Sequence, residues 1–214
     1  MEEALADLER IQTRILQRIS DLELLYLPQR FSQSVSISAA AADNSTTEGR
    51  LSAILRSNGV KDFSFKRVPC DYYTWTLEAR RDVLDAASIH HLCKSIVLVN
   101  TQAPANITDC RDRNNSKYYV VVVQYTARFN AEAKKFNMRL APEETSVKLT
   151  GYEHNGVTCI GMKTDIPVIL DEAVVKLIPD FFWLGGGEID LKLGIKTSEF
   201  IDFVNPFIIN CSGC

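Results

Sequence analysis

The sequence has no long apolar run and no excess of basic residues. Its longest apolar stretch, Tyr118 to Val123, is far shorter than the ~20 residues that a membrane-spanning helix needs. A signal or transit peptide begins basic or poor in acids, whereas this chain begins MEEALADLE, so we expect a cytoplasmic, or nuclear, location and no membrane contact. The net charge of −3 excludes a protein that coats DNA, because such proteins are strongly basic.

Common catalytic motifs are also missing. The sequence contains no phosphate-binding loop, no serine nucleophile elbow, no zinc-protease motif and no dinucleotide-binding motif. Its six cysteines are spread over a chain long enough to fold without disulfides, so we interpret them as reduced thiols. The close pair Cys211 and Cys214 has neither a second pair nor a nearby histidine to complete a zinc site. We therefore expect no metal and no cofactor.

The chain divides into three segments. In residues 1–28, apolar residues are spaced alternately three and four apart, which predicts an amphipathic, coiled-coil-like helix that ends at Pro28. This helix either docks on a protein partner or a second copy, or packs on its own domain. Residues 29–44 are rich in serine and alanine and predict a flexible linker. Residues 45–214 are then the folded domain, with a short C-terminal tail.

The folded domain is expected to be α+β, with a mixed, largely antiparallel sheet. Unbroken β-branched runs, as in SIVLVN and YYVVVVQY, are typical of strands buried on both faces. The predicted helices are Thr47–Ser57, which ends at Gly59, Leu77–His91, Asn130–Met138, Pro142–Leu149 and Thr197–Phe203. The predicted strands are Phe63–Val68, Ser95–Asn100, Tyr118–Tyr125, Gly156–Met162, Pro167–Leu170, Phe181–Leu184 and Ile189–Leu193.

One lysine and two glycine-rich turns are the candidate functional features. Lys94 precedes a strongly apolar strand, where its stem can be buried and its ammonium can bind a phosphate or carboxylate. The alternative is a strand-end lysine that reaches solvent. The turns at 150–161 and 184–187 can bring free backbone N–H groups to an oxyanion, or can be ordinary hairpin turns.

Taken together and in this order, these features resemble a known family. The segments are Lys94 to Leu98, TGYEHNGVTCIG at 150–161, Ile169 to Asp171, the glycine pair at 185–186 and Asp190 to Leu193. Over roughly 58–203 the chain resembles the YbaK / prolyl-tRNA-synthetase-associated (INS-like) editing family, which hydrolyses wrongly charged aminoacyl-tRNA. The resemblance implies a barrel-like, largely antiparallel sheet with surrounding helices, preceded here by the amphipathic helix.

The resemblance further implies a free-standing trans-editing aminoacyl-tRNA deacylase whose substrate is tRNA mischarged with a small amino acid. Lys94 would bind the tRNA 3′ end, and Asp190 would orient this lysine or the attacking water. A ribose hydroxyl would assist, and backbone N–H groups between 156 and 161 would face the carbonyl. The pocket would be formed by Gly151, Tyr152, Gly156, Thr158, Gly161, Gly185, Gly186 and Gly187.

The chain departs from the family pattern at three positions. Asn155, Cys159 and Leu184 replace a glycine, a proline and a serine. These changes bear on substrate choice, and they leave open an alternative function. The alternative is a weakly active or inactive tRNA-binding or scaffold subunit of a synthetase assembly.

Positive charge is concentrated in one stretch. Residues 111–139 hold seven basic and two acidic side chains, a net charge of +5, which leaves −8 for the rest of the chain. Such a stretch suits contact with a tRNA backbone, and Arg128, Lys134 and Lys135 are the expected contacts. The alternative is an ordinary solvated surface.

Overall fold

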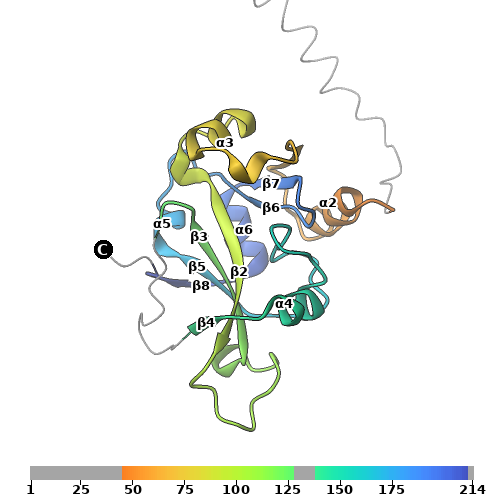
Figure 1. Cartoon of the computed structure of the whole chain (residues 1–214), viewed down its shortest axis with the longest axis vertical. Helices are drawn as coiled ribbons and strands as arrows, with labels where there is room; N and C mark the ends of the chain where they lie inside the picture. Colours follow the sequence, from red (N-terminus) through yellow and green to blue (C-terminus); the bar gives the residue numbers. More distant parts are fainter. Residues whose placement is uncertain (1–44, 128–137, 212–214) are drawn as a thin grey trace, which may run out of the picture. The chain divides into compact units, whose positions relative to one another are not determined.

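The computed structural model describes residues 45–127 and 138–211 of the chain. The predicted helix 1–28, the linker 29–44, most of the predicted helix 130–138, and Arg128, Lys134 and Lys135 lie outside these ranges. The described residues form an α+β fold with two sheets (Figure 1). Among the described residues, no helix is long and apolar enough to cross a membrane.

A five-stranded mixed sheet has the order β4-β2-β3-β5-β8. Strand β2 pairs antiparallel with β3 and β4, whereas β5 runs parallel to β3 and β8. A three-stranded antiparallel sheet has the order β1-β7-β6. The strands are β1 (Phe63–Arg67), β2 (Cys93–Asn100), β3 (Tyr118–Gln124), β4 (Met138–Leu140), β5 (Val168–Asp171), β6 (Phe182–Gly185), β7 (Leu191–Ile195) and β8 (Phe207–Ile209).

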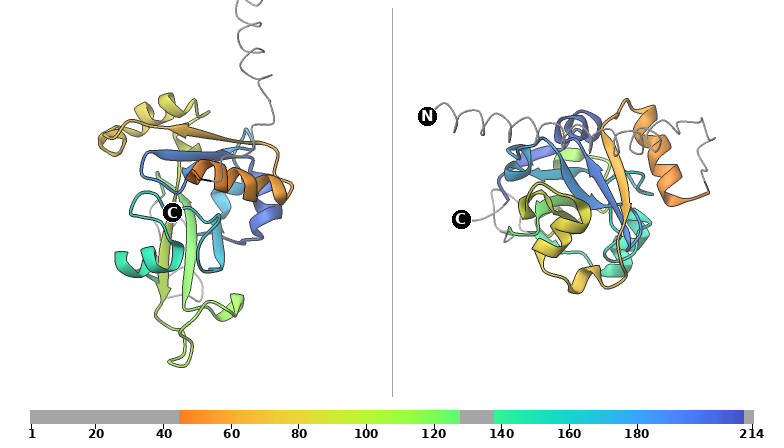
Figure 2. Two further views of the ribbon diagram at one scale, coloured as in Figure 1. Left: turned by 90° about the vertical axis from the view of Figure 1, so that its right-hand side faces the viewer. Right: turned by 90° about the horizontal axis from the view of Figure 1, so that it is seen from above.

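In residues 45–127 and 138–211, five α-helices and three short 3₁₀ turns surround the sheets. The α-helices are α2 (Thr47–Ser57), α3 (Leu77–Leu84), α4 (Glu143–Thr150), α5 (Glu172–Val175) and α6 (Thr197–Val204). The 3₁₀ turns are η1 (Tyr72–Thr74), η2 (Ile89–His91) and η3 (Arg113–Asn115). Helix α2 begins where the Thr46 hydroxyl accepts a hydrogen bond from the Gly49 N–H at 3.0 Å, which satisfies a free donor of its first turn. Figure 2 shows α2 beside the three-stranded sheet.

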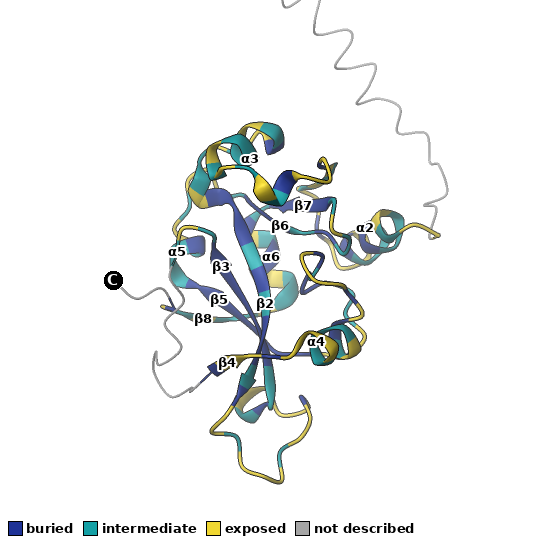
Figure 3. Ribbon diagram, viewed as in Figure 1, coloured by how far each residue is buried: buried dark blue, intermediate teal, exposed yellow. Residues whose placement is uncertain are grey.

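The apolar run in β3 reflects burial on both faces of the sheet. Val120 and Val122 face the main core, which also contains residues of both sheets, α2 and α6. Tyr119, Val121 and Val123 pack in a second cluster on the opposite face. Figure 3 shows β3 buried along its length, while the loop from β2 to β3 extends away from the sheets and is largely exposed. The prediction of a strand buried on both faces is therefore confirmed for β3, whereas in β2 Ile96 and Val99 are only half-buried.

Three predicted features are wrong. The predicted helix 77–91 ends at Leu84, because Asp85 adopts a left-handed backbone with φ of 55°. The predicted strand 156–162 is a series of turns, since Asn155 and Gly161 both have φ of +65° and the segment packs on α2. The predicted barrel does not close within the described residues. The two sheets pack on a common core and are joined there by one isolated β-bridge, between Leu92 and Trp183.

Candidate active site

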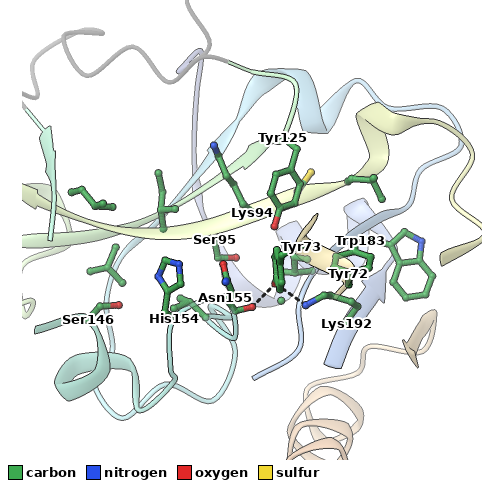
Figure 4. A pocket seen from close by; sticks show the side chains of 18 of the residues that line it. Tyr72, Tyr73, Lys94, Ser95, Tyr125, Ser146, His154, Asn155, Trp183 and Lys192 are labelled. Carbon is green, nitrogen blue, oxygen red and sulfur yellow. Dashed lines mark hydrogen bonds between the residues drawn. The ribbon is translucent and has the colours of Figure 1, made fainter. Parts of the chain in front are cut away.

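A cavity of about 380 Å³ lies between the two sheets. Strand β2 forms one wall, and the neighbouring ends of β6 and β7 form another. Helix α4 and the segment 154–157 border one side, and the aromatic residues of η1 border the other (Figure 4). The cavity therefore lies where four segments far apart in the sequence come together.

Lys192 is the buried cation of this cavity. It lies on β7 between two leucines, and only 3% of its surface is exposed. Its Nζ donates hydrogen bonds to the Tyr73 hydroxyl at 2.8 Å and to the Ile189 carbonyl at 2.7 Å. Burial lowers the pKa of Lys192 to about 8, against the opposing effect of the Asp190 carboxylate. A sizeable fraction of this side chain is therefore neutral near pH 8.

Tyr73 connects Lys192 to the loop that follows α4. Its hydroxyl donates to the Asn155 carbonyl at 2.6 Å, and the chain of hydrogen bonds from Lys192 to Asn155 is drawn in Figure 4. The Lys192 ammonium also lies 4.6 Å from the centre of the Tyr73 ring and 5.2 Å from that of Tyr72. Burial raises the pKa of Tyr73 above its ordinary value, so the phenol stays neutral at physiological pH. The cavity wall here is aromatic and positively charged.

Ser95 contributes a hydroxyl to the opposite wall. It is buried on β2, and in Figure 4 its side chain extends toward Asn155. Its Oγ has no hydrogen-bond partner among the described residues. Since buried polar groups are almost always hydrogen-bonded, this hydroxyl is a candidate contact for a ligand.

Lys94, the predicted catalytic lysine, borders the cavity but extends away from its polar cluster. Neighbouring residues of a strand point to opposite faces, and Figure 4 shows Lys94 and Ser95 on opposite sides of β2. The Lys94 ammonium lies 5.9 Å from the centre of the Tyr125 ring. The structure therefore does not bring Lys94 to Lys192 and Tyr73.

Asp190, the second predicted catalytic residue, lies in a surface ion pair. Its carboxylate is 2.9 Å from Arg67 Nη1, which also contacts Glu188 at 2.9 Å. Its side chain is 44% exposed. Asp190 is not among the residues that line the cavity, and it influences the site through its charge near Lys192.

The two glycine-rich turns do meet, as the resemblance implies. A Cβ on Gly185 would lie 2.3 Å from the Val157 carbonyl oxygen, so only glycine allows this close approach. The Gly187 N–H donates to the Gly156 carbonyl, and the Gly156 N–H itself donates to Glu153. The Gly186 N–H donates to the Leu191 carbonyl. These three amides are therefore used inside the protein, and of the predicted glycines Gly185 lines the cavity.

The remaining predicted site residues shape the loop rather than line the cavity. The Tyr152 hydroxyl donates to the Ile160 carbonyl at 2.7 Å and accepts from Arg50 of α2. Gly161 packs against α2, and Gly151 ends α4 in a left-handed conformation with φ of 81°. Thr158 is fully buried, and its hydroxyl has no partner among the described residues.

Sequence reasoning missed Lys192, Tyr73 and Ser95. There was a signal for Lys192 in the sequence, because a lysine between two leucines in a short apolar strand is expected to be buried together with its charge. Tyr73 carried none, since its role depends on a contact across 119 residues. Within the described ranges, no group of three or more His, Cys, Asp or Glu side chains is placed to hold a metal ion, and Cys70, Cys93, Cys110, Cys159 and Cys211 are free thiols.

Comparison with known proteins identifies the family. The model of the aminoacyl-tRNA editing domain matches residues 79–203, more than half of the chain. The chain belongs to the aminoacyl-tRNA editing domain family. Within this editing domain lie the cavity walls from β2, α4, β6 and β7, whereas η1 with Tyr73 precedes the matched segment. The resemblance inferred from the sequence is thus confirmed.

Solved structures confirm the fold of this editing domain. A crystal structure of a candidate trans-editing enzyme for prolyl-tRNA synthetase aligns with a TM-score of 0.62 and 19% identity, over 78% of this chain and 98% of that chain. A hypothetical protein aligns with a TM-score of 0.60 and 18% identity, over 77% of this chain and 99% of that chain. No curated protein matches the sequence.

Proposed function

We propose that the protein is an aminoacyl-tRNA deacylase, which hydrolyses the ester bond of tRNA mischarged with a small amino acid. Family membership is the observation that carries this proposal, because editing domains act on aminoacyl-tRNA. The cavity between the sheets supports it, since it combines a buried ammonium, a buried hydroxyl and aromatic walls in a volume of about 380 Å³. A cavity of this size accepts an aminoacyl group and part of the terminal nucleoside.

Each wall of the cavity has a role in this proposal. The Ser95 hydroxyl donates to the carbonyl oxygen as negative charge develops there, while a ribose hydroxyl of the terminal adenosine assists the attacking water. Lys94, beside Tyr125, binds the terminal phosphate at the rim. The turns 154–157 and 184–187 limit the size of the amino acid. Asp190 acts only through Lys192, whose charged form it favours.

Regions outside the cavity would bind the rest of the substrate and partners. Arg128, Lys134 and Lys135 are proposed to contact the tRNA backbone. The protein itself would act in trans, in the cytoplasm, on tRNA that a synthetase has charged. Helix 1–28 is proposed to dock on a protein partner or a second copy. Light scattering of the full chain with and without Ile11→Asp and Ile15→Asp tests self-association, since charges in the apolar seam would dissociate a dimer.

The alternative is a tRNA-binding module with little or no activity. One observation favours it: the N–H groups of Gly156, Gly186 and Gly187 are bonded to backbone acceptors and do not form an oxyanion site. In this alternative the cavity binds the tRNA 3′ end without hydrolysing the ester.

A panel of tRNAs, each carrying a noncognate small amino acid, separates the two functions. Hydrolysis by the wild type, reduced about 100-fold by Ser95→Ala, supports the deacylase, because loss of one oxyanion donor has an effect of this size. Binding of charged tRNA without hydrolysis supports the module. If the protein neither binds nor hydrolyses any member of the panel, both proposals are wrong.

A further inference from the structure

Lys192 has a hydrogen-bonding arrangement that suits proton transfer. The Tyr73 hydroxyl has one hydrogen, which it donates to the Asn155 carbonyl at 2.6 Å. Tyr73 must therefore accept its second bond, at 2.8 Å, from Lys192 Nζ. The Ile189 carbonyl can only accept, and it takes another donor of the same nitrogen at 2.7 Å. Two of the positions around Nζ are fixed in this way.

The two protonation states of Lys192 differ at the one remaining position. An ammonium has three N–H donors, so the charged form keeps one N–H for a ligand. A neutral amine has two N–H donors and one lone pair, and both donors are already used. The neutral side chain therefore presents a lone pair, and its orientation is fixed by Tyr73 and Ile189.

From this geometry we propose that Lys192 is the general base of the deacylation reaction and accepts the proton of the attacking water. The inference rests on the proposed function and adds a residue to it. Tyr73 is the positioning residue, because it holds Nζ and is itself held by Asn155.

The surroundings of Lys192 bring its pKa down toward physiological pH, so that part of the side chain is a neutral amine there. Burial has the largest effect and lowers its pKa to about 8. The charged or titratable groups nearest to it are Tyr72 and Tyr73 of η1, Arg80 of α3, Lys66 opposite it on β1, and Asp190 on its own segment. Tyr125 has a side-chain hydrogen bond with Tyr73, and the remaining titratable residues that line the cavity are Cys93, Lys94, Glu143 and His154. Asp190 opposes the loss of the proton, whereas Arg80 favours it. A base with a pKa near the working pH is effective in proton transfer.

The proposed step balances as an ester hydrolysis. Neutral Lys192 removes a proton from water while the water oxygen bonds to the ester carbonyl carbon. The tetrahedral intermediate then collapses, the bond from this carbon to the ribose oxygen breaks, and the Lys192 ammonium returns the proton to that oxygen. The products are the free amino acid and tRNA with its terminal hydroxyl restored, and Lys192 is neutral again.

Three full-length variants test this role in assays on a mischarged tRNA that the wild type hydrolyses. Lys192→Met removes the base. Lys192→Arg keeps the positive charge but does not lose its proton in this pH range. Lys66→Met is the control, because it removes the lysine that lies opposite Lys192 in the β1–β7 ladder. Rates are measured from pH 6.5 to 9 after subtraction of spontaneous hydrolysis, and the folding of each variant is checked by circular dichroism and thermal melting.

Proton transfer predicts a specific pattern. The wild-type kcat should rise with pH and level off above about 8. Lys192→Met and Lys192→Arg should both lower kcat about 100-fold, with KM changed less than about threefold, and should lose this rise. Lys66→Met should keep the wild-type profile. Tyr73→Phe should reduce kcat more than KM, because it leaves Nζ less fixed.

Two results overturn the proposal. If Lys192→Arg retains activity, the site needs a positive charge and not a base. If Lys192→Met is folded and as active as the wild type, Lys192 has no catalytic role, although the deacylase function stands. A wild type that hydrolyses no mischarged tRNA contradicts the proposed function itself, and the base role falls with it.

Discussion

Lys66 and Lys192 lie directly opposite each other in the β1–β7 ladder, yet their ammonium groups have different partners. Lys66 donates to the Leu84 carbonyl at 2.6 Å, whereas Lys192 donates to Tyr73 and Ile189 inside the cavity. The ladder therefore places two lysines side by side, and only Lys192 lines the cavity.

The buried charge of Lys192 predicts an unusual pH dependence of stability. Its pKa is lowered from 10.5 to about 8 on folding. Below pH 8 both states are protonated and the folded protein carries the full penalty of the buried charge. Between pH 8 and 10.5 the unfolded chain holds more protons than the folded one, so this group stabilises the fold increasingly as pH rises.

Urea unfolding of the wild type and Lys192→Met at pH 7 and pH 10 measures this effect, because titrations of the tyrosines and cysteines cancel in the difference. From pH 7 to pH 10, the free energy of unfolding of the wild type should increase relative to that of Lys192→Met by up to about 3 kcal/mol, at ~1.36 kcal/mol per pKa unit. A difference that is the same at both pH values would show that Lys192 does not titrate abnormally.

The close contact of Gly185 with Val157 predicts a large effect of one methyl group. Gly185→Ala would place a Cβ 2.3 Å from a backbone oxygen, which the packed turns can relieve only by moving. We expect a loss of about 3 kcal/mol, at the upper end of the range for overpacking, together with lower deacylase activity. Gly59→Ala is the matched control, since it has a left-handed φ of 83° but open space, and should lose only ~1 kcal/mol. Equal losses would contradict the proposed wall.

Much of the fold was predictable because it depends on local patterns. Strands β2 and β3 were visible as β-branched runs, and α2 was predicted with its observed ends. The turn segment 156–162 was mistaken for a strand because its apolar residues pack on α2, and a sequence does not show which element a residue packs on. Strands β4 and β8, of three residues each, are too short to give a periodic signal.

The site was predictable in position but not in its residues. The resemblance led to β2 and to the glycine turns, and both border the cavity. The resemblance favoured Lys94 as the catalytic residue. Neighbouring residues of a strand point to opposite faces, however, so Ser95 faces the polar cluster of the cavity and Lys94 does not. Lys192 is in the cavity because Tyr73, 119 positions away, holds its ammonium, and such a contact exists only in the folded chain.

Lys94 and Lys192 are predicted to act at different stages of the reaction. At the rim, Lys94 binds the substrate phosphate, so Lys94→Ala should raise KM about fivefold and leave kcat nearly unchanged, as expected for the loss of about 1 kcal/mol of uniform binding. Steady-state kinetics with one mischarged tRNA measures both constants. A loss in kcat as large as that of Lys192→Met would instead place Lys94 in the chemical step.

The basic stretch 111–139 is predicted to contact tRNA. Reversing Arg128, Lys134 and Lys135 to glutamate should weaken tRNA binding and flatten its dependence on salt, since each lost phosphate contact reduces the number of released counterions. A control protein with Arg56, Lys61 and Lys176 reversed undergoes the same change in net charge. If the two proteins bind tRNA equally well, the stretch is an ordinary solvated surface.

Single-turnover hydrolysis of mischarged tRNA by excess wild-type protein tests the central claim most directly. The account predicts that at least one tRNA carrying a small noncognate amino acid is deacylated far faster than by water alone, and that Ser95→Ala slows this reaction about 100-fold. If every member of the panel decays at its spontaneous rate in the presence of folded protein that binds it, the cavity is a binding site and the protein is not a deacylase.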